Sequence, residues 1–172
     1  MEIIEIIKYI APSIIVFLTS YLIIRVFLEK DERKRRFELN LNNQKLITPL
    51  KLQAYERVIL FLERTAPEAL IIRVQASNMT ARDLQSALLV TIRTEFEHNL
   101  SQQIYISNDA WEATKMAKES IVKLINAASM RMNENAKAME LSKTIIEMYM
   151  TIEDSPTNKA IKIVKNEIQT IL

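Results

Sequence analysis

The sequence predicts an all-α protein, in which one N-terminal transmembrane helix is followed by a cytoplasmic bundle of five to six helices. Three observations support this fold class. Glycine is absent from the 172 residues. Hydrophobic residues make up 49% of the chain but aromatics only 6%, and apolar residues recur at helical spacing. Hairpin turns, dinucleotide loops and phosphate-binding loops need glycine, so β-rich, Rossmann and P-loop folds are disfavoured.

The first expected element is a membrane span between Tyr9 and Leu28. Residues 9 to 24 carry no charge, and extension to residue 28 adds only Arg25. Twenty helical residues cover about 30 Å, the thickness of a hydrocarbon core. The expected anchor residues are Tyr9, Ile14, Ile15, Val16, Phe17, Leu18, Tyr21, Leu22, Ile23, Ile24, Phe27 and Leu28.

Basic residues gather at the C-terminal end of this span. They are Arg25, Lys30, Arg33, Lys34, Arg35 and Arg36, whereas only Lys8 precedes the span. The positive-inside rule then places the N-terminus outside and the C-terminal domain in the cytoplasm. Because acidic residues alternate with this cluster, we expect an orientation signal and a solvated helix extension rather than a specific acidic-lipid site.

A membrane span accounts for the apolar run better than a signal peptide or a core helix does. A cleaved signal peptide would begin with basic residues, but this chain begins with Glu2 and Glu5 and offers no small-residue cleavage site between residues 25 and 36. A buried core helix is the second alternative, although a 16-residue uncharged run followed by a basic cluster is a poor core helix.

The rest of the chain divides into a connector and one domain. Residues 1–36 form the anchor and basic juxtamembrane segment, and residues 37–48 are polar and asparagine-rich, which indicates a connector. Thr48 and Pro49 are expected to be the N-cap and first residue of a helix that opens the bundle domain, residues 49–172. Prolines at 49, 67 and 156 argue against one long helix.

The expected bundle helices follow from caps and apolar spacing. A helix from Pro49 is broken at Pro67, where a short helix runs to about Val74. Thr80 and Asp83 resemble a capping box before a helix over 81–102. Residues 103–107 favour a brief strand or extended connector. Ser107 starts the next helix, with an apolar face of Trp111, Thr114, Ala117, Ile121, Leu124, Ile125, Ala128 and Met132; helices over 135–152 and from Ser155-Pro156 to the C-terminus complete the set.

Composition excludes several kinds of chemistry. Cysteine is absent and His98 is the only histidine, so we expect no catalytic residues, no metal site and no cofactor. Residues 37–172 contain sixteen basic and sixteen acidic residues. Nucleic acid binding usually needs a basic face, which a domain of zero net charge disfavours. No nucleic acid partner is therefore expected, and a local basic patch is the alternative that the sequence leaves open.

One segment combines polar groups with large aromatics and is the candidate interaction site. Its residues are Glu95, His98, Gln102, Gln103, Tyr105 and Trp111. Glu95, His98 and Gln102 share a helix face, which suits a hydrogen-bonding or general-base site; the alternative is a histidine paired locally with an acid. Tyr105 and Trp111 suit an interface or the bundle core. Met116, Met130, Met132, Met139, Met148 and Met150 suit core packing or an adaptable groove.

Residues Ile47 to Arg57, Arg93 to Ser107, and Ala110-Trp111 resemble an uncharacterised family of small single-span bacterial membrane proteins with a cytoplasmic helical domain. The resemblance covers nearly the whole length. It implies placement in the bacterial inner membrane and contributes no mechanism.

Together these observations predict a non-enzymatic membrane-anchored scaffold or accessory subunit. Its expected partners are the lipid bilayer and either a protein partner or a second copy of itself. The alternative is a membrane-tethered enzyme or small-ligand sensor with a site around Glu95 and His98. That alternative requires the polar side chains to converge on one accessible pocket.

Overall fold

The computed structural model describes the backbone of residues 2 to 171 and the side-chain environments of residues 14 to 170. Over these residues the all-α prediction is confirmed. The helices are α1 (Glu2–Thr65), α2 (Pro67–Val74), α3 (Ala81–Asn99), α4 (Asn108–Ser129), α5 (Ala138–Met150) and α6 (Pro156–Ile171), with a 3-10 helix η1 (Leu100–Ile104). The chain divides into two compact units, Met1–Thr48 and Pro49–Leu172.

In the first unit, α1 leaves its apolar side chains uncovered. The large apolar residues from Ile14 to Leu28 are each 50 to 69% exposed. After them the helix carries ion pairs between residues four apart, Arg25 with Glu29 at 3.2 Å and Arg36 with Glu32 at 2.6 Å. These pairs stabilise a solvated helix by a few tenths of a kcal/mol each, about 0.2–0.5.

Within the described residues, no helix combines the length and the hydropathy needed to cross a bilayer. The predicted span begins at Tyr9, and the side chains of residues 9 to 13 lie outside the described part. The membrane span therefore stays a prediction.

The helix start predicted at Thr48 is wrong, because α1 runs without interruption through residues 37–48 and through Pro49. Proline removes one backbone hydrogen bond and crowds the preceding turn, at a cost of about 3 kcal/mol. Leucine, glutamine, glutamate and lysine on both sides are good helix formers. The asparagines, which suggested a connector, lower helix propensity only modestly.

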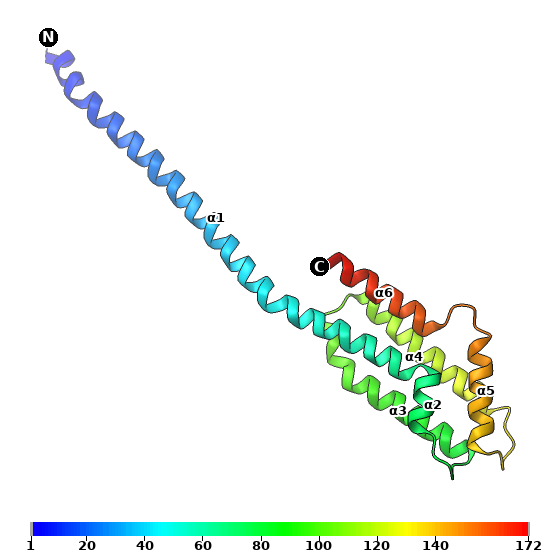
Figure 1. Cartoon of the computed structure of the whole chain (residues 1–172). Helices are drawn as coiled ribbons and strands as arrows, with labels where there is room; N and C mark the ends of the chain where they lie inside the picture. Colours follow the sequence, from blue (N-terminus) through cyan, green and yellow to red (C-terminus); the bar gives the residue numbers. More distant parts are fainter. Residues whose placement is uncertain (1, 172) are drawn as a thin grey trace. The chain divides into compact units, whose positions relative to one another are not determined.

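The second unit is organised around α4 (Figure 1). The buried face of α4 matches the predicted one. The first half of α4, with Ala110, Trp111 and Ala117, packs in a cluster with the end of α1 and with α6. Its second half, with Ile121, Leu124, Ile125 and Ala128, packs in another cluster with α2, α3 and α5. The predicted Met132 lies just after α4 and is half-buried against the second cluster.

Three predicted helix starts are confirmed. The Thr80 hydroxyl accepts a hydrogen bond from the Asp83 N–H at 3.2 Å, and the Asp83 carboxylate accepts one from the Thr80 N–H at 3.1 Å. The Ser107 and Ser155 hydroxyls accept bonds from the N–H groups of Ala110 and Asn158. Such caps satisfy backbone donors that the first helical turn leaves free.

The strand suggested for residues 103–107 is absent from the described structure, and the helix predicted over 81–102 ends at Asn99. The chain forms η1 and a turn instead, closed by the Tyr105 N–H donating to the Gln102 carbonyl at 3.0 Å. An isolated strand would leave its backbone groups unpaired, whereas bonds between residues three apart satisfy them within the segment.

A polar cluster ties α1, α4 and α6 together. The Glu167 carboxylate of α6 accepts hydrogen bonds from the Tyr55 hydroxyl, from the Ser107 N–H at 3.2 Å and from the Ser107 hydroxyl at 2.6 Å. Tyr55 is only 2% exposed. Its burial, together with the neighbouring Glu167 carboxylate, raises the pKa of its hydroxyl, so the group stays a hydrogen-bond donor even at alkaline pH.

We expect Tyr55→Phe to destabilise the chain by about 1–2 kcal/mol, because it removes a donor to a carboxylate while preserving the ring. Chemical denaturation of the full chain in mild detergent measures the change. Tyr105→Phe is the matched control, since Tyr105 is half-buried and its hydroxyl is not part of the Glu167 cluster. Equal stability of the two variants would contradict a stabilising role for the cluster.

The capping box at α3 predicts a pH dependence. The hydroxyl and N–H of Thr80 hold the pKa of the Asp83 carboxyl below its ordinary value. The carboxylate therefore stabilises the fold above the unfolded-state pKa, and this contribution is lost as pH falls through the lower folded-state pKa. Asp83→Asn should lower the melting temperature at about pH 6 and lose its effect at a pH well below the ordinary pKa of aspartate.

Asp109→Asn, in the first turn of α4, is the control for a general helix-dipole effect. Thermal unfolding followed by circular dichroism at both pH values makes the comparison. A constant difference between the Asp83 variant and the wild type across this range would contradict the assignment.

Candidate functional site

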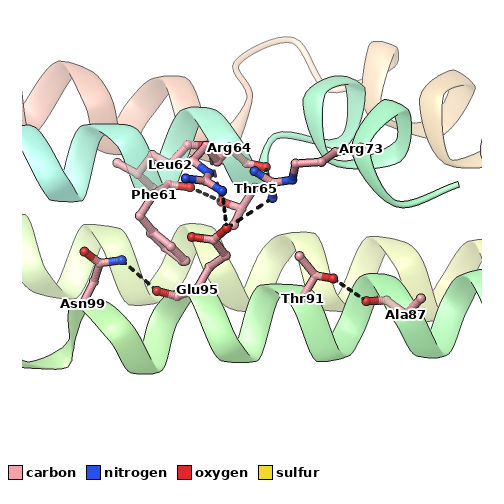
Figure 2. Close-up of polar contacts among 9 residues, drawn as sticks. All are labelled: Phe61, Leu62, Arg64, Thr65, Arg73, Ala87, Thr91, Glu95 and Asn99. Atoms are coloured by element: carbon pink, nitrogen blue, oxygen red, sulfur yellow. Dashed lines mark hydrogen bonds and ion pairs between the residues drawn. The ribbon is translucent and has the colours of Figure 1, made fainter.

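Glu95, the first residue of the predicted interaction site, is engaged by two arginines (Figure 2). Its carboxylate Oε1 lies 2.8 Å from Arg64 Nη2 and 3.5 Å from Arg73 Nη2, and the Glu95 side chain is 19% exposed. Arg73 also donates to the Arg64 carbonyl at 3.3 Å, and the Asn99 side chain donates to the Glu95 carbonyl at 2.7 Å. Glu95 therefore fixes α3 to the end of α1 and to α2.

The other predicted site residues do not gather around this carboxylate. His98 and Gln103 are exposed, whereas Gln102 is half-buried and donates to the Ser101 hydroxyl at 3.2 Å. Tyr105 is half-buried against the core cluster of α1, α4 and α6. The six residues thus lie in different surroundings in the described structure, and their interaction role stays a prediction.

Trp111 belongs to the core, which was the alternative left open by the sequence. It is 7% exposed, and its ring stacks on Phe96 of α3 with centroids 5.3 Å apart. Phe96 in turn packs against Phe61 of α1 at 5.7 Å. This row of aromatic rings joins α1, α3 and α4, and such pairs add about 0.5–1.5 kcal/mol each beyond their buried area.

The methionines are divided between core and surface. Met132 and Met148 are half-buried against the core, whereas Met116, Met130, Met139 and Met150 are 66 to 86% exposed. Core packing is therefore wrong for four of the six. These four lie on helix faces, or just after a helix, away from the buried stripe.

A groove between α3 and α4, which the sequence did not predict, is a concave surface of the described structure. Its volume is about 650 Å³, within the range of known ligand pockets. Its apolar lining comes from Leu89, Ile92, Phe96, Leu100 and Val122, and its polar lining from Arg93, Glu97, Lys118, Glu119, Lys123 and Asn126.

The antiparallel packing of α3 and α4 fixes which residues face each other across the groove. Near one end, the Gln85 amide donates to the Asn126 side chain at 3.0 Å and accepts from the Ser129 hydroxyl at 2.7 Å. Toward the other end, the Lys118 ammonium lies 4.2 Å from the centre of the Phe96 ring. This cation–π contact keeps a positive charge at the groove.

The charges of the groove are mixed in sign. Arg93 and Glu97 are four residues apart on α3, and Glu119 and Lys123 are four apart on α4. None of the four makes an ion pair in the described part of the chain, although other pairs at this spacing do so on α1 and α5. In the sequence these residues look like an ordinary solvated face, and the signal that distinguishes them is Phe96 in their midst.

The comparisons with known proteins agree with the resemblance. A model of a family of unknown function matches residues 1–171. The chain belongs to the DUF7935 family. No curated protein and no solved structure matches the chain. Membership of DUF7935 confirms that the resemblance is to a family without assigned function and that it covers the whole chain, but it does not test the single membrane span.

No candidate metal site is found in the described part of this DUF7935 chain. There, no three histidine, aspartate or glutamate side chains lie close enough together to hold a metal ion. The groove contributes two carboxylates, Glu97 and Glu119, alongside three cationic side chains. Its composition suits contact with a surface that combines apolar groups with charges of both signs.

The two arginine contacts predict different roles for Glu95 and His98. Glu95→Ala should destabilise the fold by about 1–3 kcal/mol, because it leaves two arginines without a partly buried partner. His98→Ala, three residues along the same helix and exposed, should change stability by less than about 0.5 kcal/mol. Denaturation of both variants tests this, and an equal loss for His98→Ala would contradict the described placement.

Proposed function

We propose that this chain is a membrane-anchored, non-enzymatic scaffold or accessory subunit, in which the start of α1 inserts into a bilayer. The observation that carries the proposal is the uncovered apolar run from Ile14 to Leu28, whose large side chains are each at least 50% exposed. Soluble proteins rarely expose a contiguous apolar surface of this extent. A bilayer is the partner that covers all sides of such a helix.

The energetics of insertion favour this partner. At the centre of a span, leucine, isoleucine, phenylalanine and valine each favour insertion by about 0.3–0.6 kcal/mol, whereas a lysine, arginine or aspartate costs about 2.5–3.5 kcal/mol. Residues 9 to 24 contain no charged side chain, and Arg25 lies near the end, where it can reach the headgroups. The basic residues that follow favour a cytoplasmic domain.

A binding role for the domain, rather than a catalytic one, is supported by the structural contacts of its two partly buried carboxylates. The Glu95 carboxylate is held by two arginines, and the Glu167 carboxylate accepts bonds from Tyr55 and Ser107. Both groups stabilise the fold. The alternative of an enzyme or ligand sensor around Glu95 and His98 has no supporting geometry, since the described groove between α3 and α4 is lined by neither residue.

The anchor is tested by fractionating cells that express the full chain. The wild type should sediment with membranes and resist extraction by alkaline carbonate. Leu18→Asp combined with Ile23→Lys should release the chain, because two central charges cost about 5–7 kcal/mol of insertion energy. Phe37→Asp combined with Leu46→Lys is the matched control outside the span. A wild-type chain found dissolved would refute the anchor.

Orientation is measured with single cysteines, which the cysteine-free chain allows. A membrane-impermeant maleimide added to whole cells should label Glu2→Cys, whereas it should label Thr170→Cys only after lysis. Labelling of Thr170→Cys in intact cells would contradict the cytoplasmic placement.

A further inference from the structure

An exposed stripe along α3 borders the groove between α3 and α4. Val90 is 60% exposed and Leu100, at the start of η1, is 40% exposed. Arg93, Thr94 and Glu97 lie between them and are also exposed. Residues three, four and seven apart fall on one side of a helix, so the stripe presents apolar ends and a charged centre.

This stripe is complementary to itself. When two copies of α3 pack antiparallel around a two-fold axis level with residue 95, positions equally distant from that level face each other. Arg93 then faces Glu97 of the second copy, and Glu97 faces its Arg93. By the same rule, Val90 faces Leu100 of the second copy. Opposite charges meet opposite charges, and apolar side chains meet apolar side chains, at every one of these positions.

We propose that a second copy of this chain occupies the groove, with α3 of each copy packed into the groove between α3 and α4 of the other. Val90 is the side chain that enters, and the groove receives it beside Leu100 and Phe96. Two-fold symmetry requires a surface that matches its own rotated image, and the stripe on α3 meets this requirement. A surface evolved for an unrelated partner has no such requirement.

The charges of α4 fit the same arrangement. Glu119 and Lys123 border the groove four residues apart, in the opposite order to Arg93 and Glu97. An α3 helix of the second copy that lies in the groove therefore finds both signs of charge on each side. The proposed dimer depends on the proposed anchor in one respect only. Confinement to a membrane raises the local concentration of the chain and so the occupancy of weak contacts.

A charge exchange tests the pairing. Arg93→Glu alone places two carboxylates opposite each other at both symmetric positions of the dimer, and Glu97→Arg alone places two guanidinium groups together at the same positions. Each single substitution should raise the dimer dissociation constant by at least about tenfold. The double substitution Arg93→Glu with Glu97→Arg restores opposite charges and should recover most of the affinity. Analytical ultracentrifugation of the full chain in mild detergent measures the constants.

The control is the exposed pair Lys143 and Glu147 on α5, which has the same spacing and order of charge. Lys143→Glu, Glu147→Lys and their combination should leave the dimer dissociation constant unchanged. Thermal unfolding of each variant shows whether it is folded. A monomeric wild type, a swap without recovery, or equal effects at Lys143 and Arg93 would each overturn the proposal.

Cysteine cross-linking locates the axis. Thr94→Cys lies one residue from the level of the axis, so two copies should form a disulfide under mild oxidation, whereas Lys143→Cys should not. If Lys143→Cys cross-links as efficiently as Thr94→Cys, the proposed interface is wrong. Membrane retention is measured separately: a retained monomer overturns only the dimer, and a dissolved dimer overturns only the anchor.

Discussion

The domain depends on the burial of one face of α4. Eight residues of this helix are buried, and they contribute to both hydrophobic clusters of the second unit. The first half of the helix holds the end of α1 and α6, and the second half holds α2, α3 and α5. Each fully buried leucine or isoleucine contributes about 1.5–3 kcal/mol. Ile121, near the middle of α4, is 1% exposed, and its truncation would leave a cavity in the core that α4 shares with its neighbours.

Around this helix, polar groups fix the ends of its neighbours. Glu95 joins α3 to α1 and α2, and Glu167 joins α6 to α1 and to the start of α4. Each of these carboxylates is partly buried and has several donors, because an unpaired buried charge is expensive. These polar contacts thereby fix the helices in specific positions, which a core made mainly of interchangeable aliphatic residues does not do by itself.

Much of the bundle could be predicted from local patterns. The capping box at Thr80, the cap at Ser107 and the proline start at residue 156 each depend on a few adjacent residues, and each lies where it was predicted. The buried face of α4 followed from apolar spacing over more than five turns. Pro49 misled the prediction because the same residue begins some helices and is tolerated inside others, and its immediate sequence does not distinguish the two.

The candidate site was less predictable, because its geometry depends on contacts far apart in the chain. Glu95 and His98 share a face by spacing alone, but Arg64 and Arg73 draw the glutamate toward α1 and α2 while the histidine remains exposed. The groove likewise appears only when α3 and α4 are packed together. Arg93, Glu97, Glu119 and Lys123 have the composition of any solvated helix surface. Phe96 beside Arg93 and Glu97 is the one local signal, and it does not show that α3 and α4 border the same cavity.

Charge balance connects the groove to the proposed association of two copies. Residues 49–172 contain fifteen basic and fifteen acidic residues, so two domains meet without net repulsion at distances beyond the Debye length, about 8 Å in physiological salt. At shorter range the order of charges decides the outcome, because like charges placed opposite each other are penalised. The domain is neutral, and both borders of its apolar groove carry opposite charges four residues apart. A second copy can therefore dock there favourably in only a few orientations. The excess positive charge of the chain lies before residue 37, outside the domains that are proposed to associate.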